Sequence, residues 1–369
     1  MDFSYSEEQT LLRNSLSRYL ADNYSFAAWR KFTRGEEGRD PKHWAAFAEL
    51  GLFAAALPEA HGGFGGGALE TAIIMEEFGR RLVIENFVPT AVIAPALLAD
   101  GSDAQKSEWL AKIATGGTCM AFAFAEAQGR YNLADLTTTA KKSGDGYALN
   151  GKKVAVIGAP FADTLIVTAR TGGGQRDHEG VGVFLLDAKT PGITIRGYRT
   201  IDSGRAADIL LENVAAPVER RIGGEALAAI ERAVDAAIAA HCAEAVGAMR
   251  VLVDATVAYA KTRQQFGQPI GKFQVLQHRM VDMAIAREQA VSAALMGALR
   301  PDPRSVSAAR AVIGNAARSI GQGAIQIHGG MGMTDELDVG HYFKRLTVLE
   351  LLYGSTDHHL ARMTALDAA

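Results

Sequence analysis

The sequence has few cysteines and no marked excess of charge of either sign. Its 369 residues include only two cysteines, Cys119 and Cys242, and carry a formal net charge of -3 at pH 7. Two cysteines are too few for a disulfide framework and lack metal-ligand spacing, so we expect no metal site and a reducing compartment, the cytoplasm. The charge balance provides no basic surface for a phosphate backbone, which argues against nucleic acid as a partner.

A leader segment and long apolar runs are also missing. The chain begins with MDFSYSEEQTLLRNSLSRYL, which lacks a basic region followed by an apolar core, so we expect no signal peptide. No apolar run reaches the roughly 20 residues that cross a bilayer, and we expect no membrane partner. With 48% hydrophobic and 21% charged residues, the composition is that of a globular protein, and the length predicts two or three domains.

The periodicity of the apolar residues divides the chain into three regions, an order that predicts an α+β fold. Residues 1–115 show helical spacing throughout, and Ser4 and Glu7 have the spacing of a capping box, so a helix should begin near Ser4. Residues 223–369 return to helical spacing, with helices expected from Glu225 to about Arg263 and then over 271–299, 303–327 and 340–353. These last helices should form a bundle.

The middle region, 116–222, has short β-branched and aromatic runs separated by glycine, proline and aspartate. Such runs predict a small antiparallel β-sandwich or barrel. Asn150-Gly151 is a two-residue hairpin signal, because both residues tolerate positive φ. The stretch TGGGQRDHEG at 171–180 should be an exposed hairpin loop.

Several familiar functional motifs are either absent or lie in the wrong structural context. The glycine-rich stretches GGFGGG and GGMGM neither follow a strand nor open a helix in a βαβ unit, so they are not dinucleotide-binding fingerprints. There is no G-x-S-x-G nucleophile elbow, and Cys242 lies within an alanine-rich helix as a core residue. The adjacent histidines His358 and His359 diverge by about 100° on a helix, which disfavours a shared metal.

The segment YAKTRQQFGQPIGKFQ, 259–274, connects two predicted helices through a glycine turn. It is either a plain inter-helix turn with one solvated arginine, Arg263, or a turn whose guanidinium clamps a pyrophosphate. The residues of this segment alone leave both readings open.

Three stretches together resemble the acyl-CoA dehydrogenase family of flavoproteins, and the resemblance spans nearly the whole chain. They are YAKTRQQFGQPIGKFQ, QIHGGMGMTDELDVGHYFKR through LLYGST, and AFAEAQGRYNLADLTTTAKKSGDGYALNGKKV. The resemblance implies an N-terminal helical domain over 1–115, a middle β-domain over 116–222 and a C-terminal four-helix bundle over 223–369. It also implies FAD as cofactor and an acyl-CoA thioester as substrate, which is oxidised to the 2-enoyl product.

The resemblance further implies a set of cofactor-binding residues, part of which reaches the FAD of a neighbouring subunit. Arg263 would hold the pyrophosphate, and Gln326, Gly329 and Gly330 would contact the same half of the cofactor. The adenosine part would be lined by Phe266, Ile270, Phe273 and Gln274. The chain's own flavin half would involve Phe124, Ala125, Tyr131, Ile157 and Ser355.

That flavin half departs from the family pattern. The usual T-E-P-x-A-G-S-D stretch corresponds to residues 125–132, in which the threonine is Ala125 and the serine is Tyr131. The usual W-I-T stretch corresponds to Ala155-Val156-Ile157, so the aromatic wall and its hydroxyl neighbour are missing.

The catalytic base also departs from the pattern. The family's glutamate precedes a glycine after the helix that follows GGMGM, and Tyr353 stands there. A phenol, with a reference pKa of about 10, is a poor base at neutral pH. The alternative position of the glutamate, on the first long bundle helix, is occupied by Ala237.

Substitute bases are available nearby in sequence. Asp235, Glu244 and Glu350 are most simply surface or capping charges, and Glu244 ranks first as a base because it interrupts an apolar stretch. His241 either faces the cleft or is a core histidine.

Three functions remain open on these grounds. The chain is an acyl-CoA dehydrogenase acting in a homo- or hetero-oligomer, a dimer or a tetramer, with an electron-transfer flavoprotein as a possible acceptor. Alternatively, it is a silent partner that completes a sister chain's FAD site, as in the small subunits of two-subunit, pimeloyl-CoA dehydrogenase-like enzymes. The third reading is a flavin monooxygenase-like member of the same fold, which needs no base.

Overall fold

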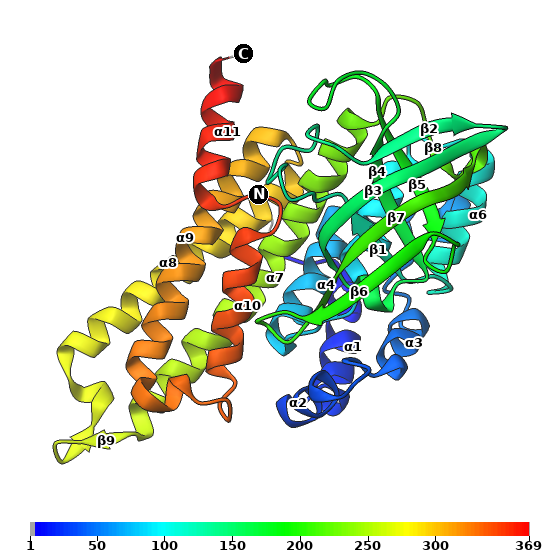
Figure 1. Ribbon diagram of the computed structural model, residues 1–369. Coiled ribbons are helices and arrows are strands. Elements are labelled where there is room, and N and C mark those ends of the chain that lie inside the picture. The colour runs from blue at the N-terminus through cyan, green and yellow to red at the C-terminus, as the bar shows by residue number, and fades with distance from the viewer. Residues whose placement is uncertain (1–3, 369) are drawn as a thin grey trace. The chain divides into compact units, whose positions relative to one another are not determined.

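The computed structural model describes residues 4–368 and shows the predicted order of helices, then strands, then long helices (Figure 1). The described residues form two compact units. One unit comprises the described parts of Met1–Lys31, Ala68–Val83 and Ile238–Ala369, and the other comprises Phe32–Gly67 and Ile84–Ala237. The α+β fold class with a β-rich middle is confirmed, whereas the domain boundaries near 115 and 222 stay predictions.

The first unit is helical. Its α-helices are α1 (Glu7–Asn23), the start of α2 (Phe26–Arg34), α4 (Ala68–Arg81), most of α7 (Leu227–Thr262), α8 (Gln274–Leu299), α9 (Pro303–His328), α10 (Val339–Leu351) and α11 (Thr356–Ala368). Between α7 and α8 lie the two short strands β9 (Gln264–Gln265) and β10 (Gln268–Pro269) and a 3-10 turn over Ile270–Lys272; a second 3-10 turn covers Gly329–Met333.

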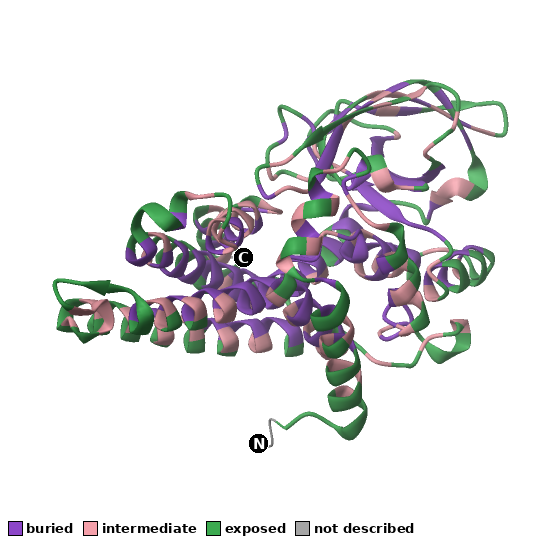
Figure 2. Ribbon diagram, turned by 90° about the horizontal axis from the view of Figure 1, so that it is seen from below, coloured by how far each residue is buried: buried purple, intermediate pink, exposed green. Residues whose placement is uncertain are grey.

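Helix α7 owes its length to an almost unbroken run of good helix formers, with alanine at many positions. By length and composition it could cross a membrane, but 83% of its most apolar 18-residue window is buried inside the protein. Figure 2 shows the inner faces of the long helices buried and their outer faces exposed, as expected for helices that pack around a common core.

Two glycines bring α4 and α7 into backbone contact. A Cβ added at Gly79 of α4 would lie 1.9 Å from the carbonyl oxygen of Glu244, and one added at Gly247 of α7 would lie 2.0 Å from that of Glu76. Distances this short are not found for real side chains, so both positions require glycine. The crossing therefore fixes the backbone of α7 at Glu244.

The second unit combines short helices with one sheet. The helical elements are α3 (Pro41–Glu49), a 3-10 turn at Glu59–His61, a π-helix at Val88–Ile93, α5 (Ala94–Leu98), α6 (Asp103–Ala114) and 3-10 turns at Ala159–Phe161 and Val218–Arg220. The strands are β1 (Met120–Ala123), β2 (Thr139–Ser143), β3 (Gly146–Ile157), β4 (Thr164–Arg170), β5 (Val181–Asp187), β6 (Ile193–Arg199), β7 (Arg205–Pro217) and β8 (Arg221–Ile222).

The eight strands form one sheet in the order β6-β7-β3-β2-β4-β5-β8, with β1 paired to β4. The sheet is mixed rather than purely antiparallel, because β1 and β2 both run parallel to β4. Alternate residues of β3, β4, β5 and β7 pack into one apolar core, which includes Leu149, Phe184 and Leu211. The opposite face of β3 and β7 carries partly exposed and polar residues.

Two local predictions were wrong. The first helix is capped by Ser6, whose hydroxyl accepts from the amide of Gln9 at 3.2 Å, rather than by Ser4. The β2–β3 hairpin turns at Gly144-Asp145, because the pairing ends at Ser143 and Gly146, and Asn150-Gly151 lies inside β3 at a register shift. The asparagine-glycine pair therefore makes a bulge instead of a turn, and the Asn150 side chain accepts from the amide of Asn213 at 2.8 Å.

Candidate functional site

The predicted pyrophosphate segment is an exposed arm. Arg263 directly follows α7, and β9 and β10 form a hairpin with Phe266 and Gly267 at its tip, at φ of 55° and 77°. Two consecutive positive φ values are typical of the two-residue hairpin turns that suit a twisted ribbon. Phe266 holds this strained conformation while 91% exposed, and its ring meets that of Phe273 edge-on at 6.1 Å. Strain combined with an exposed aromatic is a feature of binding segments.

The second predicted segment lies beside the arm. The ring of Tyr259, one turn before Arg263, stacks on His328 at 4.4 Å between centroids, and His328 directly precedes Gly329. Gln326, Gly329 and Gly330 are exposed, and a Cβ added at either glycine would meet no atom within 4 Å. The structure thus brings the two segments together at one end of the helical unit.

These segments fit a flavin nucleotide held outside this chain's own fold. The Arg263 side chain is exposed and makes no hydrogen bond or ion pair with any residue in the described range 4–368. The two phenylalanine rings of the arm suit an adenosine, and the unpaired Arg263 guanidinium suits a pyrophosphate. The two open glycines leave room for the same ligand to approach the backbone. Ile270 and Gln274 lie at the foot of the arm, partly buried and exposed respectively.

The β-domain half of the predicted site offers fewer groups that could bind the cofactor than the arm does. Phe124 and Ala125 follow β1, and their carbonyl oxygens are already bound, one by the Lys153 ammonium at 3.3 Å and the other by the amide of Val154 at 2.9 Å. Tyr131 is partly buried and Ile157 is exposed. The structure offers no hydroxyl at position 125 and no aromatic ring at 155, so this half fits a flavin ring less well than the arm fits the nucleotide.

Ala155 sits in a bulge of β3 with a φ of 51°. Its amide donates to Asp208 Oδ1 at 3.3 Å, and the hydroxyl of Tyr198 donates to the same oxygen at 3.3 Å. The ammonium of Lys152 contacts the other oxygen of Asp208 at 2.9 Å. The strand position where the family has its aromatic wall is therefore held by a polar cluster around Asp208 on the outer face of the sheet.

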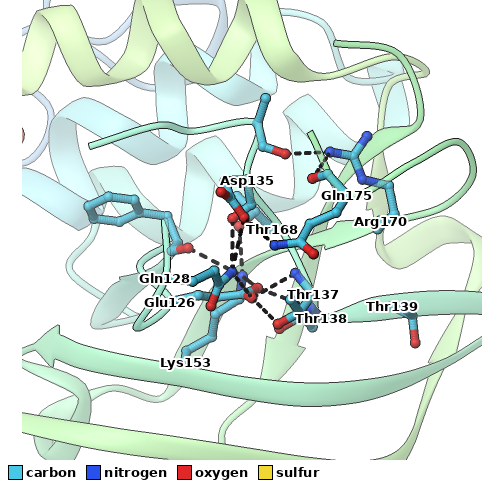
Figure 3. A network of polar contacts seen from close by, with 12 residues as sticks. Glu126, Gln128, Asp135, Thr137, Thr138, Thr139, Lys153, Thr168, Arg170 and Gln175 are labelled. Carbon is cyan, nitrogen blue, oxygen red and sulfur yellow. Dashed lines mark hydrogen bonds and ion pairs between the residues drawn. The ribbon is translucent and has the colours of Figure 1, made fainter. Parts of the chain in front are cut away.

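A buried network, which sequence reasoning missed, organises the loop between β1 and β2 (Figure 3). The Glu126 carboxylate accepts from the ammonium of Lys153 at 2.8 Å and from the amides of Thr137 and Thr138 at 2.7 and 3.1 Å. Gln128 and the Thr137 hydroxyl also donate to it. The signal was present in the sequence, since a lysine at an inward-facing strand position needs a buried partner.

The ionisation of this pair follows from its contacts. Burial works to raise the pKa of Glu126, but the charge and hydrogen bonds of Lys153 outweigh it and the pKa is lowered. Burial lowers the pKa of Lys153, and the charge of Glu126 opposes that shift. The pair is ion-paired at neutral pH and fixes the backbone of residues 124–126.

The predicted hairpin loop 171–180 is confirmed between the antiparallel strands β4 and β5. The Arg170 guanidinium donates to the carbonyl oxygens of Gln175, Asp177 and Glu179 at 2.9, 2.8 and 2.6 Å. Asp135, which accepts from Gln175 at 2.6 Å, joins this loop to the network of Glu126 through Gln128 (Figure 3).

Tyr353 follows α10 in a strained position, with a φ of 58°. The buried guanidinium of Arg310 donates to the carbonyl oxygens of Leu349, Leu352 and Gly354, which holds the turn around Tyr353. Burial raises the pKa of the Tyr353 phenol well above its ordinary value. The phenol is therefore protonated at neutral pH and is not suited to remove a proton.

Glu244 is not the surface or capping charge that the sequence suggested. Its side chain is 1% exposed, and its carboxylate meets Arg345 Nε at 2.6 Å and His241 Nδ1 at 2.8 Å. Burial would raise the pKa of Glu244, but Arg345 and His241 outweigh it and lower the pKa to about 2. An ionised carboxylate so firmly paired is a weak proton acceptor, and its predicted role as a base stays a prediction.

The other sequence candidates take structural positions. Ser355 accepts from the amide of His358 at 3.4 Å and so caps α11. Glu350 accepts from the amide of Thr356 at 3.1 Å, which agrees with a capping charge, whereas Asp235 is buried rather than on the surface. Within residues 4–368, no group of three or more His, Cys, Asp or Glu side chains is placed to hold a metal ion.

Comparison with known proteins matches every region of the chain. Three family models match: "Acyl-CoA dehydrogenase, N-terminal domain" over residues 6–117, "middle domain" over 121–214 and "C-terminal domain" over 223–365. The human mitochondrial short-chain specific acyl-CoA dehydrogenase is 30% identical over 322 residues, which cover 84% of this chain and 78% of that protein.

Two solved structures extend the comparison. The ChsE4-ChsE5 complex of Mycobacterium tuberculosis matches with a TM-score of 0.89 and 25% identity, covering 100% of this chain and 99% of that one. The FAD complex of PigA matches with a TM-score of 0.90 and 26% identity, covering 100% and 99%. The similarity thus includes a complex of two chains and a structure that holds FAD.

Proposed function

The chain belongs to the acyl-CoA dehydrogenase family, whose members are FAD flavoproteins, and we propose that it is one subunit of an assembly that oxidises an acyl-CoA thioester to its 2-enoyl product. When bound, FAD would supply the electron-accepting chemistry for the hydride that leaves the β-carbon of the thioester. This chain contributes Arg263, the Phe266–Phe273 edge and the glycines at 329 and 330 to the cofactor of a neighbouring subunit.

The observation that carries the proposal is the exposure of the arm. Phe266 pays for a positive φ of 55° and exposes 91% of its surface to water, and the nearby Arg263 side chain makes no hydrogen bond or ion pair within residues 4–368. Their placement is understood if another molecule covers them. The ChsE4-ChsE5 complex, one chain of which this chain resembles, is a precedent for a neighbour that is a sister chain.

The test is the FAD content of the purified assembly. Arg263→Ala should lower the apparent affinity for FAD at least 10-fold, because one charge-assisted contact to the pyrophosphate is removed. Arg279→Ala, which removes another exposed arginine from α8, is the matched control and should retain FAD. Full FAD retention by the Arg263 variant would contradict the proposal.

A second candidate, the catalytically silent partner, is favoured by Tyr353. A neutral phenol at the base position and an alanine in place of the aromatic wall leave this chain's own half-site altered. The visible spectrum of the chain purified alone, recorded anaerobically before and after addition of acyl-CoA thioesters, decides between the two. Bleaching of a yellow protein supports a self-sufficient site, whereas a colourless protein supports the silent partner.

The electron acceptor is open to a direct test. We propose an electron-transfer flavoprotein, which should be reduced anaerobically by the assembly in the presence of a bleaching thioester. Rapid reoxidation of the reduced flavin by air, without reduction of that acceptor, would instead favour the monooxygenase-like reading.

A further inference from the structure

An imidazole lies directly against the residue at the base position. His241, on α7, stacks its ring on that of Tyr353 at 6.0 Å between centroids, with an angle of 25° between the planes. It lies one helical turn after Ala237, on the same face of the helix. Its side chain is 11% exposed, so the ring is largely buried but not sealed.

The contacts of Glu244 fix which nitrogen of His241 carries the proton. Arg345 keeps the Glu244 carboxylate ionised, and an ionised carboxylate only accepts hydrogen bonds. His241 Nδ1, 2.8 Å from that carboxylate, must therefore be the protonated nitrogen of the neutral ring. The other nitrogen, Nε2, then has a lone pair, and it makes no hydrogen bond to any residue in the described part of the chain.

The charges around His241 keep it in the form that accepts a proton. Burial lowers the pKa of His241, and Arg345 on α10 and Arg310 on α9 lower it further, while Glu244 opposes the shift. The ring is consequently neutral at pH 7. A proton taken up at Nε2 would produce an imidazolium whose charge is balanced by the buried Glu244, the arrangement by which a carboxylate supports a histidine base.

We propose that His241, oriented by Glu244, accepts the α-proton of an acyl-CoA thioester in this chain's own site, in place of a carboxylate at position 353. In this step the α-carbon–hydrogen bond breaks, its electron pair stays on the α-carbon as an enolate conjugated with the thioester carbonyl, and the proton joins Nε2. Oxidation is completed when hydride leaves the β-carbon for oxidised FAD, the acceptor of the proposed function on which this inference rests.

Proton removal can be measured without flavin reduction. We would incubate the anaerobic, FAD-loaded assembly with butyryl-CoA and octanoyl-CoA in deuterated buffer and follow α-deuterium incorporation by mass spectrometry. His241→Asn should slow exchange at least 100-fold, because its amide provides no basic nitrogen. His278→Asn, at an exposed histidine of α8, is the matched control and should exchange like the wild type.

The pH profile separates a catalytic role from a structural one. Exchange by the wild type should fall as the pH drops through a value below 6.5, because protonated His241 accepts no further proton. Glu244→Gln removes the charge that favours the imidazolium, so this acid limb should move to lower pH and exchange should slow roughly 10-fold. If His241 served in packing alone, Glu244→Gln would leave this acid limb at the wild-type pH.

Three outcomes overturn the proposal: exchange by a folded His241→Asn variant at the wild-type rate, loss of exchange in Tyr353→Phe but not in His241→Asn, and no exchange by an FAD-loaded wild type at any pH. If the asparagine variant fails to fold, the wild-type acid limb and His241→Gln give the same decision. Failure of the proposed function has a different signature, because Arg263→Ala would then leave the FAD content unchanged.

Discussion

Two buried carboxylates, Glu126 in the β-domain and Glu244 in the helical unit, show how similar ion pairs acquire different roles. Glu126 accepts from one ammonium, two amides, one hydroxyl and one side-chain amide, and all these donors belong to the network itself. Glu244 has two partners, and one of them is an imidazole with a second nitrogen left over. We call the Glu126 network closed, because its polar groups are used to hold a loop. We call the Glu244 network open, because the second imidazole nitrogen of its histidine is available for chemistry.

The largest loss of stability is expected from a substitution of Lys153. Lys153→Met should lower the free energy of unfolding by about 3–5 kcal/mol, because it leaves the Glu126 carboxylate buried without its cation. Glu126→Gln combined with Lys153→Met should recover a large part of the loss. Thermal unfolding followed by circular dichroism measures both, and equal losses in the single and double variants would contradict a closed pair.

Arg345→Met tests the open network and should cost less, about 2–3 kcal/mol. Glu244 loses its guanidinium partner, but His241 can take up a proton and replace the missing charge. The pKa of His241 should therefore rise, which NMR of its ring protons measures. The variant should be most stable at low pH, where the imidazolium forms, and a pH-independent loss would show that the histidine does not respond.

Glu85 provides a third case for the comparison, because it is a buried carboxyl without the close cation that Glu126 and Glu244 have. Its side chain is 0% exposed, and its nearest cation, the Arg39 guanidinium, lies 3.9 Å away. Burial raises the pKa of Glu85 to about 7. A raised carboxyl pKa stabilises the fold below the unfolded value near 4.5, and this contribution is lost as the pH rises through 7.

Glu85→Gln should consequently become more stable relative to wild type as the pH rises. The advantage should grow by roughly 2–3 kcal/mol between pH 5 and pH 8. Chemical unfolding at the two pH values measures the change, and Glu59→Gln, at an exposed carboxyl of the same unit, is the control. An advantage that stays the same between pH 5 and pH 8 would show that Glu85 is already ionised in the fold at pH 5.

The smallest effect on stability is expected at the arm. Phe266→Ala should change the free energy of unfolding by less than about 0.5 kcal/mol, because the ring is 91% exposed. The same change should weaken FAD binding by the assembly, measured by equilibrium dialysis. A large loss of stability without an effect on FAD would assign Phe266 to the fold instead of the cofactor.

The sequence predicted the elements whose signals are local. The long helices and the short strands were found because apolar periodicity and β-branched runs do not depend on distant partners. The hairpin prediction at Asn150-Gly151 was wrong because residues that tolerate positive φ are found both in turns and in bulges. Only the pairing of β3 with β7 selects the bulge.

The candidate site was predictable to a similar extent. The arm residues could be placed from the resemblance because they are contiguous in sequence. The partnership of Glu244 with Arg345 joins residues 101 positions apart, and that of Glu126 with Lys153 joins residues 27 apart, so neither was visible from spacing. Which carboxylate is solvated and which is paired is decided by packing between elements.

The contact of Gly79 with Glu244 and of Gly247 with Glu76 has a consequence for how this chain can diverge. Any larger residue at either glycine would separate two backbones at the turn of α7 that carries Glu244. Variants at the two positions cannot compensate for one another, because each creates a new collision and neither relieves the other. Substitutions near His241 can therefore change the side chains that surround it, but they cannot shift α7 along α4.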